Sequence, residues 1–553
     1  MAVYINVNKG VDLSNIQNSQ GVETLDFVSE IDTVRFDSKN DSDRSLILRP
    51  AKPFLRLLFI GLPNAGSRPG KAGLFLPLGL AYVTAALKER GYVYDCVDLH
   101  TEKIMRPHFD FWERIQEFDL ASYDVVAFGG VFLKFEDLQY LSSRIRENYR
   151  HIFQTVGGNM ATMTPDVVLE RTQVDCICLY EGEETIIDLI QTLEKGTDWR
   201  DVKSIKYRDE NGALVSSPSR PKLSAEKVPR LPDRESWDFD LIRKAYPVGS
   251  PGRYSAVVFA SRGCPFTCTF CKPLTGKEIR TREIESIINE IKYLKERWNV
   301  QYVRFFDEVF IGSKFRIRAL CEAMIEENLN VFWWCQTQVR LIDEDLLKVM
   351  KKAGCIEIAY GVESGSDVML EDMKKGINVD IIRDVLEATD RANIRISLNL
   401  LAGTPAETVD TLRETRDFLI ALNYINWANV PAIEFVVPLP GTELFDTAVA
   451  KGLIDDPETY VVEALAKMEK YSKSINMTQM SSEEFISTVK RFNQEISRDF
   501  YTKHPVRSFL SLFGAEHLRF DLIFRHFSLK QIVPLFDAFF WVIIGKHMHH
   551  FSK

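Results

Sequence analysis

The sequence has few cysteines, no long apolar run and no surplus of basic residues, and each absence excludes a class of protein. Its nine cysteines are spread over 553 residues, and no apolar signal segment opens the chain. A secreted disulfide framework is therefore not expected, and the protein is predicted to be cytoplasmic. No stretch reaches the roughly 18 apolar residues that a membrane-spanning helix needs. The net charge of -9 opposes binding to phosphate backbones, so nucleic acid is not an expected partner.

The composition is that of a folded globular protein with more than one domain. Hydrophobic residues make up 45% of the chain and charged residues 27%, which is ordinary for such proteins. A chain of this length exceeds one core, so two or three domains are expected. The pattern predicts a loose N-terminal extension, a first α/β domain, a connector, a second α/β domain and a helical C-terminal unit, over residues 1–50, 51–196, 197–250, 251–452 and 453–553.

Short apolar strands alternate with helical stretches in the first α/β domain. The strands are predicted at residues 55–61, 92–99, 125–129, 153–156 and 175–179. Such alternation is typical of a doubly wound, Rossmann-like parallel sheet. Ligands of these sheets bind beyond the carboxyl ends of the strands, where glycine-rich turns let them approach the backbone. Those turns are Gly129-Gly130, Gly157-Gly158 and Glu181-Gly182.

A second alternation occupies the next domain. Strands are predicted at residues 255–261, 302–306, 331–335, 356–361, 394–401 and 433–437. Six β/α units suggest an open, partial (β/α)6 barrel, whose functional mouth would again lie at the carboxyl ends of the strands.

Three cysteines form a compact motif directly after the first of these strands. Cys264, Cys268 and Cys271 have C-x-x-x-C-x-x-C spacing, and thiolates are the usual ligands of iron-sulfur clusters. Three thiolates leave one iron of a 4Fe-4S cluster open to an exogenous molecule. A zinc site is the alternative, but structural zinc sites usually have four ligands and no fourth is evident nearby.

On this motif the chain resembles the radical S-adenosylmethionine (SAM) superfamily, and further motifs extend the resemblance along the barrel. They are residues 305–310, 361–366, 403–408 and 440–444. The resemblance implies a 4Fe-4S cluster whose open iron binds SAM, and reductive cleavage to a 5'-deoxyadenosyl radical. The implied SAM contacts are Asp307, Glu308, Glu363, Ser364 and Gly403. The alternative for the carboxylates is an exposed loop position, and Glu407 is interpreted as a helix cap.

The first domain resembles the cobalamin-binding domain that precedes the barrel in one large radical SAM subfamily. The resemblance rests on residues 77–92, 156–162 and 181–184. It implies cobalamin contacts at Gly129, Gly130, Gly157, Gly158, Glu181 and Gly182. A scaffold without cobalamin is the alternative, because a fold does not prove its ligand.

The D-x-H-x-x-G signature that supplies a cobalt-binding histidine is absent. Residues 61–66 read Gly-Leu-Pro-Asn-Ala-Gly where it would stand, after the first strand. Many members of the subfamily lack this histidine, so the resemblance implies cobalamin with a weak or absent protein ligand. His100 is the nearest alternative, although a lone histidine is more often a packing residue.

Several other residues have more than one plausible role. Cys335 and Cys355 are candidates for hydrogen-atom donation or for holding an intermediate, against the commoner alternative of inert buried thiols. One of Trp333 and Trp334 should point into the barrel. The segment from residue 501 onward mixes aromatic with basic residues, which suits contact with a membrane surface or a lipid-like molecule, or packing on the parent domain.

The resemblance implies a cobalamin-dependent methyltransferase. It would move a methyl group from SAM by way of methylcobalamin to an unactivated carbon, or a phosphinate phosphorus, of a small molecule or natural product. A flavodoxin or ferredoxin is the expected electron donor. The enzymatic alternative is a cyclase or oxidoreductase resembling the anaerobic magnesium-protoporphyrin cyclase, and the non-catalytic alternative is a cluster or cobalamin sensor.

Overall fold

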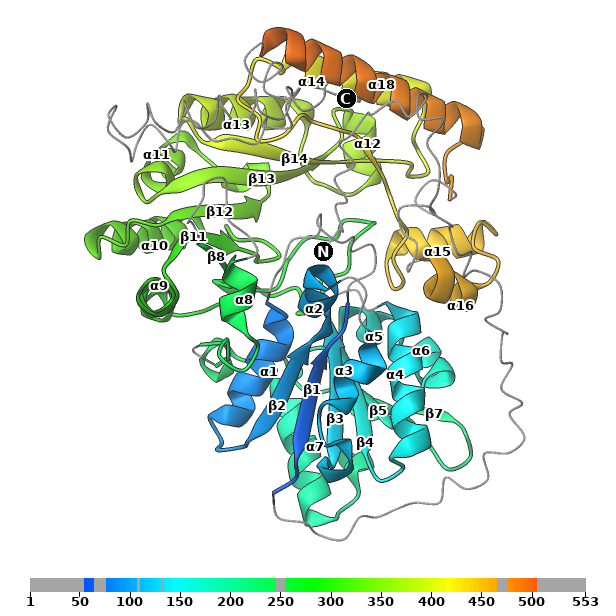
Figure 1. Ribbon diagram of the computed structural model, residues 1–553. Helices are drawn as coiled ribbons and strands as arrows, with labels where there is room; N and C mark the ends of the chain where they lie inside the picture. The colour runs from blue at the N-terminus through cyan, green and yellow to red at the C-terminus, as the bar shows by residue number, and fades with distance from the viewer. Residues whose placement is uncertain are drawn as a thin grey trace, which may run out of the picture.

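The computed structural model describes residues 54–63, 76–106, 110–130, 134–229, 231–244, 254–464 and 475–504. The predicted N-terminal extension and the aromatic, basic segment from residue 505 onward lie outside these residues. So do residues 64–66 of the turn after the first strand. The described part of the chain forms two α/β domains that pack against each other (Figure 1). Within it, no helix is long and apolar enough to cross a membrane.

The first domain is built on a seven-stranded sheet of order β2-β1-β3-β4-β5-β6-β7. Its strands are β1 Leu57–Gly61, β2 Tyr94–Asp98, β3 Val125–Gly130, β4 Phe153–Gly158, β5 Cys176–Cys178, β6 Ile205–Arg208 and β7 Leu214–Ser216. β1 to β5 are parallel, and the doubly wound sheet is confirmed. β1 is buried at all five positions, as expected of a strand with helices on both sides.

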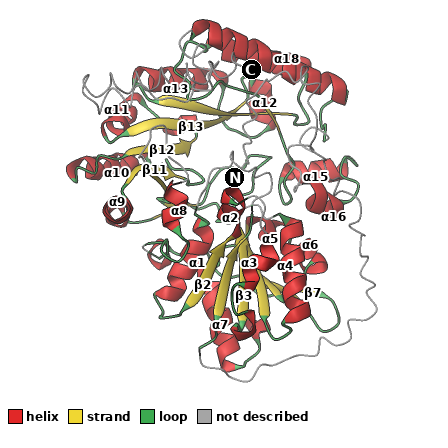
Figure 2. Ribbon diagram, in the orientation of Figure 1, coloured by secondary structure: helices red, strands yellow, loops and turns green. Residues whose placement is uncertain are grey.

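Helices flank this sheet on both faces (Figure 2). They are α1 Leu78–Lys88, α2 Leu99–Met105, α3 Phe111–Gln116, α4 Phe135–Asn148, α5 Asn159–Met163, α6 Pro165–Arg171 and α7 Glu183–Lys195, with short turns η1 Leu120–Ser122 and η2 Trp199–Asp201. The helices are amphipathic, and α7 buries Ile186, Leu189, Ile190 and Leu193. In Figure 1 the strand ends that lead into α2 and α5 point toward the second domain.

The segment predicted as a connector, residues 197–250, differs from expectation in its first half. β6 and β7 form an antiparallel pair on the edge of the first sheet. The same segment contains η3 Ala225–Lys227 and α8 Phe239–Lys244, and it buries Arg234, Trp237 and Phe239. It has apolar residues enough to pack, but its strands of three or four residues are too short to show an alternating pattern.

The second domain is built on a six-stranded sheet of order β15-β14-β13-β12-β11-β8, and every neighbouring pair is parallel. Its strands are β8 Tyr254–Val258, β11 Val300–Phe305, β12 Phe332–Thr337, β13 Cys355–Glu363, β14 Arg395–Ala402 and β15 Glu434–Phe435. The predicted six-unit open barrel is confirmed. A separate hairpin, β9 Ser261–Arg262 with β10 Arg280–Thr281, brackets the three cysteines.

Helices connect the strands of the second sheet, and two further helices follow its last strand. They are α9 Ile284–Trp298, α10 Lys314–Glu326, α11 Glu344–Lys352, α12 Asp367–Asp372, α13 Val379–Arg391, α14 Val409–Ala421, α15 Glu443–Ala450 and α16 Pro457–Thr459, with turns η4 Val339–Leu341 and η5 Tyr460–Ala464. α9 buries Ile287, Ile288, Ile291 and Leu294 at three- and four-residue steps, which is the spacing of one helix face.

The last described helix, α18 Ser482–Lys503, packs on α14 (Figure 1). Asn493 on this helix bonds both backbone groups of Ile433, which precedes β15, at 2.8 and 2.9 Å. The side-chain amide of Asn423, after α14, donates to the backbone carbonyl of Ile496 at 3.0 Å. This part of the predicted C-terminal unit therefore joins the barrel at its last strand.

Candidate active site

The three cysteines lie on a loop whose base is closed by the β9–β10 hairpin. The amide of Cys264 donates to the carbonyl of Gly276 at 3.0 Å, and the amide of Cys271 donates to that of Cys268 at 3.1 Å. All three thiols are partly buried. Burial, with smaller contributions from Cys271, Glu308 and Cys268, raises the pKa of Cys264 to about 11. The backbone thus brings the predicted thiols into electrostatic reach of one another.

Gly263 immediately precedes this loop and has a positive φ of 103°. A Cβ at this position would lie 1.9 Å from the carbonyl oxygen of Glu278. Only glycine accepts both the conformation and the close backbone approach. The glycine in the Ser-Arg-Gly-Cys sequence is therefore required by the turn that leads into the cysteine loop.

Two predicted SAM-contact acids, at the end of β11, hold the same loop. Asp307 is buried and accepts hydrogen bonds from the amides of Ala260 and Ser261 and from the Ser261 hydroxyl. Burial raises its pKa to about 6. Glu308 accepts from the Gly263 amide at 2.8 Å and from the Thr275 hydroxyl at 2.5 Å. Both carboxylates are thus bound to the loop, and a direct SAM contact by either stays a prediction.

Glu363, the third predicted acid, ends β13 beside the thiols. It has a positive φ of 71°, an uncommon conformation for a residue other than glycine. Its carboxylate is 2% exposed and lies 3.2 Å from the Nζ atom of Lys375, which is 4% exposed. Lys375 interacts electrostatically with Cys268 and Cys271. Burial raises the pKa of the Cys268 thiol, and the Lys375 ammonium acts against this shift while the Glu363 carboxylate adds to it.

A 4Fe-4S cluster and a single metal ion require different arrangements of their protein ligands. Among the described residues, no three His, Cys, Asp or Glu side chains converge on one ion position. A 4Fe-4S cluster does not require this, because each of its cysteines binds a different iron atom. Three partly buried thiols on one loop, with Lys375 opposite, suit thiolate ligation of a cluster better than that of zinc.

The remaining predicted SAM positions, Ser364 and Gly403, have partners within the barrel. The Ser364 hydroxyl lies 2.9 Å from that of Thr415 on α14. Gly403 has a positive φ of 106°, and a Cβ there would lie 3.0 Å from the Phe485 ring of α18. Its amide donates to Glu407 at 3.3 Å. SAM contacts at these two residues stay predictions.

The buried carboxyl group of Glu407 is expected to make the stability of the protein depend on pH. Its carboxyl group is buried and accepts from the Thr411 hydroxyl and the Gly403 amide, and burial raises its pKa from 4.5 to about 7. The folded state therefore holds the proton more tightly than the unfolded chain. The resulting stabilisation is complete below pH 4.5 and is lost as the pH rises through 7.

We expect Glu407→Gln, which mimics the neutral form, to remove this pH dependence. Between pH 4.5 and 8 the wild type should lose about 3 kcal/mol of unfolding free energy relative to the variant. Urea unfolding at several pH values measures the difference. Glu414→Gln, at an exposed position of α14, is the control. Parallel pH profiles for Glu407→Gln and the wild type would contradict the assignment.

Cys335 and Cys355 lie within the barrel wall. Both are buried in the apolar cluster that includes Ile287, Leu320 and Leu346 of the surrounding helices. Trp333 belongs to the same cluster, whereas Trp334 packs with Tyr302 and Phe306 on the other side of the sheet. This placement favours inert, buried thiols at Cys335 and Cys355. It also identifies Trp334 as the tryptophan of the pair that faces inward.

The predicted cobalamin glycines lie at the carboxyl edge of the first sheet, on two adjacent strands. Gly129 and Gly130 are paired with Gly157 and Gly158. Gly158 has a positive φ of 107°, and a Cβ there would lie 2.2 Å from the carbonyl oxygen of Gly130. A Cβ at Gly129 would lie 2.6 Å from the Leu80 side chain, so these glycines let neighbouring segments pack closely at the edge where the predicted group would lie. Individual contacts stay predictions. His100, the alternative cobalt ligand, is buried in the first turn of α2, and this role also stays a prediction.

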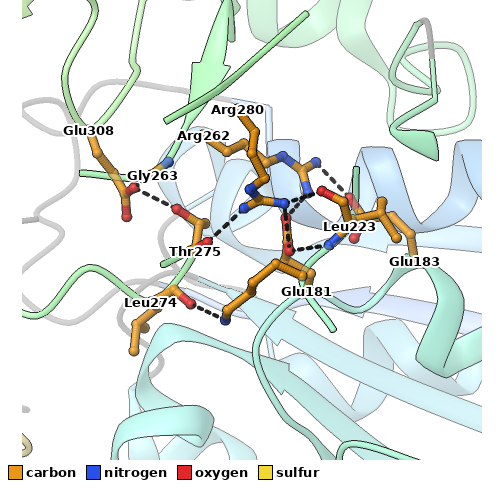
Figure 3. A network of polar contacts seen from close by, with 10 residues as sticks. Glu181, Glu183, Leu223, Arg262, Gly263, Leu274, Thr275, Arg280 and Glu308 are labelled. Atoms are coloured by element: carbon orange, nitrogen blue, oxygen red, sulfur yellow. Dashed lines mark hydrogen bonds and ion pairs between the residues drawn. The ribbon is translucent and has the colours of Figure 1, made fainter. Parts of the chain in front are cut away.

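Glu181 and Gly182, also predicted to contact cobalamin, lie in the loop between β5 and α7. The Glu181 carboxylate is bound by Arg262 and Arg280 of the cysteine hairpin, each at 2.9 Å (Figure 3). It also accepts from the Leu223 amide at 3.0 Å. The side chain therefore joins the two domains, and any cobalamin contact of this loop would involve its backbone.

Three functional candidates were missed by the sequence interpretation. Arg262 directly precedes the Gly-Cys pair, and that position is the only local sign of its role. Arg280 is the cross-strand partner of Arg262, a pairing that no local sequence pattern indicates. Lys375 follows the Glu363 motif by 12 residues, and no spacing rule connects a lysine there to the thiols.

Comparison with known proteins agrees with this arrangement. The model of the radical SAM superfamily matches residues 258–419, and that of the B12 binding domain matches residues 72–190. The first match contains the cysteine loop and the motifs that end β11 and β13. The second contains the glycine edge and the loop between β5 and α7.

Individual relatives match about 70% of the chain. An uncharacterized methyltransferase of Pyrococcus horikoshii is 28% identical over 68% of this chain and 79% of its own length. An anaerobic magnesium-protoporphyrin IX monomethyl ester cyclase of Rubrivivax gelatinosus is 27% identical over 73% and 72%. The solved structure of the radical SAM methyltransferase TsrM from Kitasatospora setae, with cobalamin and a [4Fe-4S] cluster, has a TM-score of 0.60 at 17% identity, covering 73% of this chain and 79% of that one.

Proposed function

We propose that this chain, which belongs to the cobalamin-dependent radical SAM family, is a methyltransferase. It would use two SAM molecules to methylate an unactivated carbon, or a phosphinate phosphorus, of a small molecule. One SAM donates its methyl group and leaves S-adenosylhomocysteine. The other is cleaved to methionine and 5'-deoxyadenosine, which carries the hydrogen removed from the substrate. Electrons come from a flavodoxin or ferredoxin.

The proposal is supported by the contact between the cysteine loop and the carboxyl edge of the first sheet, where cobalamin is predicted to bind. The loop after β5, at the carboxyl edge of the first sheet, is ion-paired with the hairpin that carries the cysteines. Phe270, between Cys268 and Cys271, belongs to one apolar cluster with Met160 and Ala161 of α5. An enzyme that passes a methyl group from SAM to cobalamin must bring these edges together.

The residues of the chain have separable tasks in this chemistry. When bound, the cluster would supply the electron that cleaves SAM, and the cobalamin would carry the methyl group. Cys264, Cys268 and Cys271 would hold the cluster, and the Lys375 ammonium would favour the thiolate form of Cys268. Asp307 and Glu308 keep the loop in place through backbone amides. Phe270, Cys268 and Cys271 lie in an apolar cluster, which would limit access of water to the bound group.

A test needs no knowledge of the substrate. The full chain would be reconstituted anaerobically with iron, sulfide and cobalamin, then given SAM with a deuterated methyl group and dithionite. We expect 5'-deoxyadenosine, S-adenosylhomocysteine that forms only with cobalamin present, and a deuterated methyl group on the recovered cobalamin. Formation of 5'-deoxyadenosine without methyl transfer would contradict the proposal. Absence of both products would favour a non-catalytic sensor.

The cyclase relative supports a second candidate, an oxidative ring closure that uses the same two domains. A methyltransferase adds one methyl group to its substrate, whereas a cyclase removes hydrogen and adds no carbon from SAM. Mass spectrometry of extracts of the producing cells, incubated with the enzyme and deuterated SAM, distinguishes the two. A product without deuterium would favour the cyclase.

A further inference from the structure

The cysteine hairpin is tied to the first domain by a compact group of ion pairs (Figure 3). Arg262 contacts Glu181 at 2.9 Å and Glu183 at 2.6 Å, and Arg280 contacts Glu181 at 2.9 Å. Every side chain in the group is at least 87% buried. We call these four residues the interdomain latch. Charge-assisted bonds from a rigid guanidinium fix orientation as well as distance.

Within the hairpin the two arginines are direct cross-strand partners. Like charges placed opposite each other destabilise a strand pair. Here Glu181 receives both guanidinium groups, so the acid of the first domain neutralises a repulsion within the second. The Arg262 guanidinium also lies over the ring of Tyr82, 5.2 Å from its centroid. The hairpin is therefore complete only when the first domain is docked against it.

The latch continues toward the barrel. Arg280 donates to the carbonyl of Thr275 at 2.6 Å, and the Thr275 hydroxyl donates to Glu308 at 2.5 Å. The amide of Gly263, next to Cys264, donates to the same carboxylate at 2.8 Å. A continuous polar path thus leads from the end of β11, past the cysteine loop, to the end of β5 (Figure 3).

We propose that Glu181, Arg262 and Arg280 are positioning residues that set the separation between the cluster loop and the cobalamin edge, and so the rate at which SAM passes its methyl group to cobalamin. This inference rests on the proposed function. Each of the two cofactors is held by a different domain, so their separation depends on the contacts between domains. A misplacement of about 1 Å costs roughly 100-fold in rate when reacting groups must meet.

General cohesion between the domains has a different source. Arg234, Glu290 and Arg282 form a fully buried ion-pair group between α9 and the connector, and Trp237 donates to Thr84 of α1 at 3.1 Å. The latch is instead located at the cysteine hairpin. Its loss is therefore expected to shift the hairpin while the domains remain associated.

Glu181→Gln in the full chain, reconstituted with cluster and cobalamin, tests the proposal. We expect wild-type iron and cobalamin contents and 5'-deoxyadenosine formation within about twofold of wild type, because the SAM cleavage site lies within the barrel. Cobalamin-dependent formation of S-adenosylhomocysteine should fall at least tenfold, in line with the sensitivity of such reactions to position. Glu184→Gln, next to Glu183 in the first turn of α7, is the matched control. Glu184 is 25% exposed, and its partners lie outside the cysteine hairpin: Arg90 and Arg220 at 3.8 Å and Lys227 at 4.0 Å.

A direct measurement of geometry accompanies the rates. Pulsed electron paramagnetic resonance between the reduced cluster and paramagnetic cobalt reports their separation. The distribution should be broader or longer in Glu181→Gln than in wild type and Glu184→Gln. Arg262→Lys keeps the charge but cannot bind both acids, so it should give an intermediate distance distribution and an intermediate rate. If Glu181→Gln does not retain cobalamin, Arg262→Lys provides the test in its place.

Two results would overturn the proposal. One is an unchanged distance distribution with an unchanged ratio of the two products in both variants. The other is an equal fall of both products with normal cofactor contents, which indicates a general structural role. A wild-type protein that does not bind cobalamin would instead refute the proposed function, so the two failures are distinguishable.

Discussion

Replacing Cys268 with alanine is expected to abolish formation of 5'-deoxyadenosine from SAM. The side chain is one of three on the loop that the β9–β10 hairpin closes, and its thiol interacts electrostatically with Lys375 and Cys271. Two remaining thiolates cannot hold a cluster that normally has three protein ligands. The variant should therefore bind little iron and sulfide, lose the absorbance of the cluster, and give less than about 1% of the wild-type product, the scale on which loss of an essential group acts.

The same chain provides a matched control for this prediction. Cys335→Ala removes a thiol that is fully buried in the barrel wall, among residues packed beneath the helices. It should retain the cluster and most SAM cleavage. Retention of cluster and activity in Cys268→Ala would contradict the assignment of the loop. Loss of cleavage in Cys335→Ala with the cluster intact would restore a catalytic role for that thiol.

The strands of both sheets could be predicted because buried parallel strands leave a strong local pattern. β1, for example, is a short apolar run followed by turn residues, and β13 ends in the glycine-containing motif at residues 361–366. The cysteine loop was equally local, because its three ligands lie within eight positions. Such features depend on neighbours in sequence, which is the information that one sequence contains.

Contacts between distant segments were not predictable. Arg262 and Glu181 are 81 positions apart, and neither residue carries a pattern that identifies its partner. Lys375 reaches the thiols only because β13 and the following turn fold back past the loop. The short edge strands β6 and β7 were missed because the pairing of β6 with β5 and of β7 with β6, rather than their own periodicity, makes them strands.

The boundary between the domains contains a deeply buried ion-pair group. Glu290 of α9 is 0% exposed and binds Arg234, 1% exposed, at 2.6 Å through one oxygen. Its other oxygen binds Arg282, also at 2.6 Å. Arg234 donates in addition to the carbonyl of Val257 in β8, and Arg282 to that of Phe259. One carboxylate thus neutralises two arginines where connector, helix and strand meet.

Glu290→Gln is expected to lower the free energy of unfolding by about 3–5 kcal/mol, because it leaves two buried guanidinium groups without a counter-charge. Urea unfolding followed by tryptophan fluorescence is the measurement, and buried Trp237 and Trp298 lie close to the site. Glu296→Gln, at an exposed position of the same helix, should change the free energy by no more than about 0.5 kcal/mol. If the two variants unfold alike, solvent must reach the arginines, and the domains would then be held together mainly by their apolar contacts. A large difference between them would instead identify Glu290 as the residue on which docking of the two domains most depends, while Glu181 sets the geometry of the docked state.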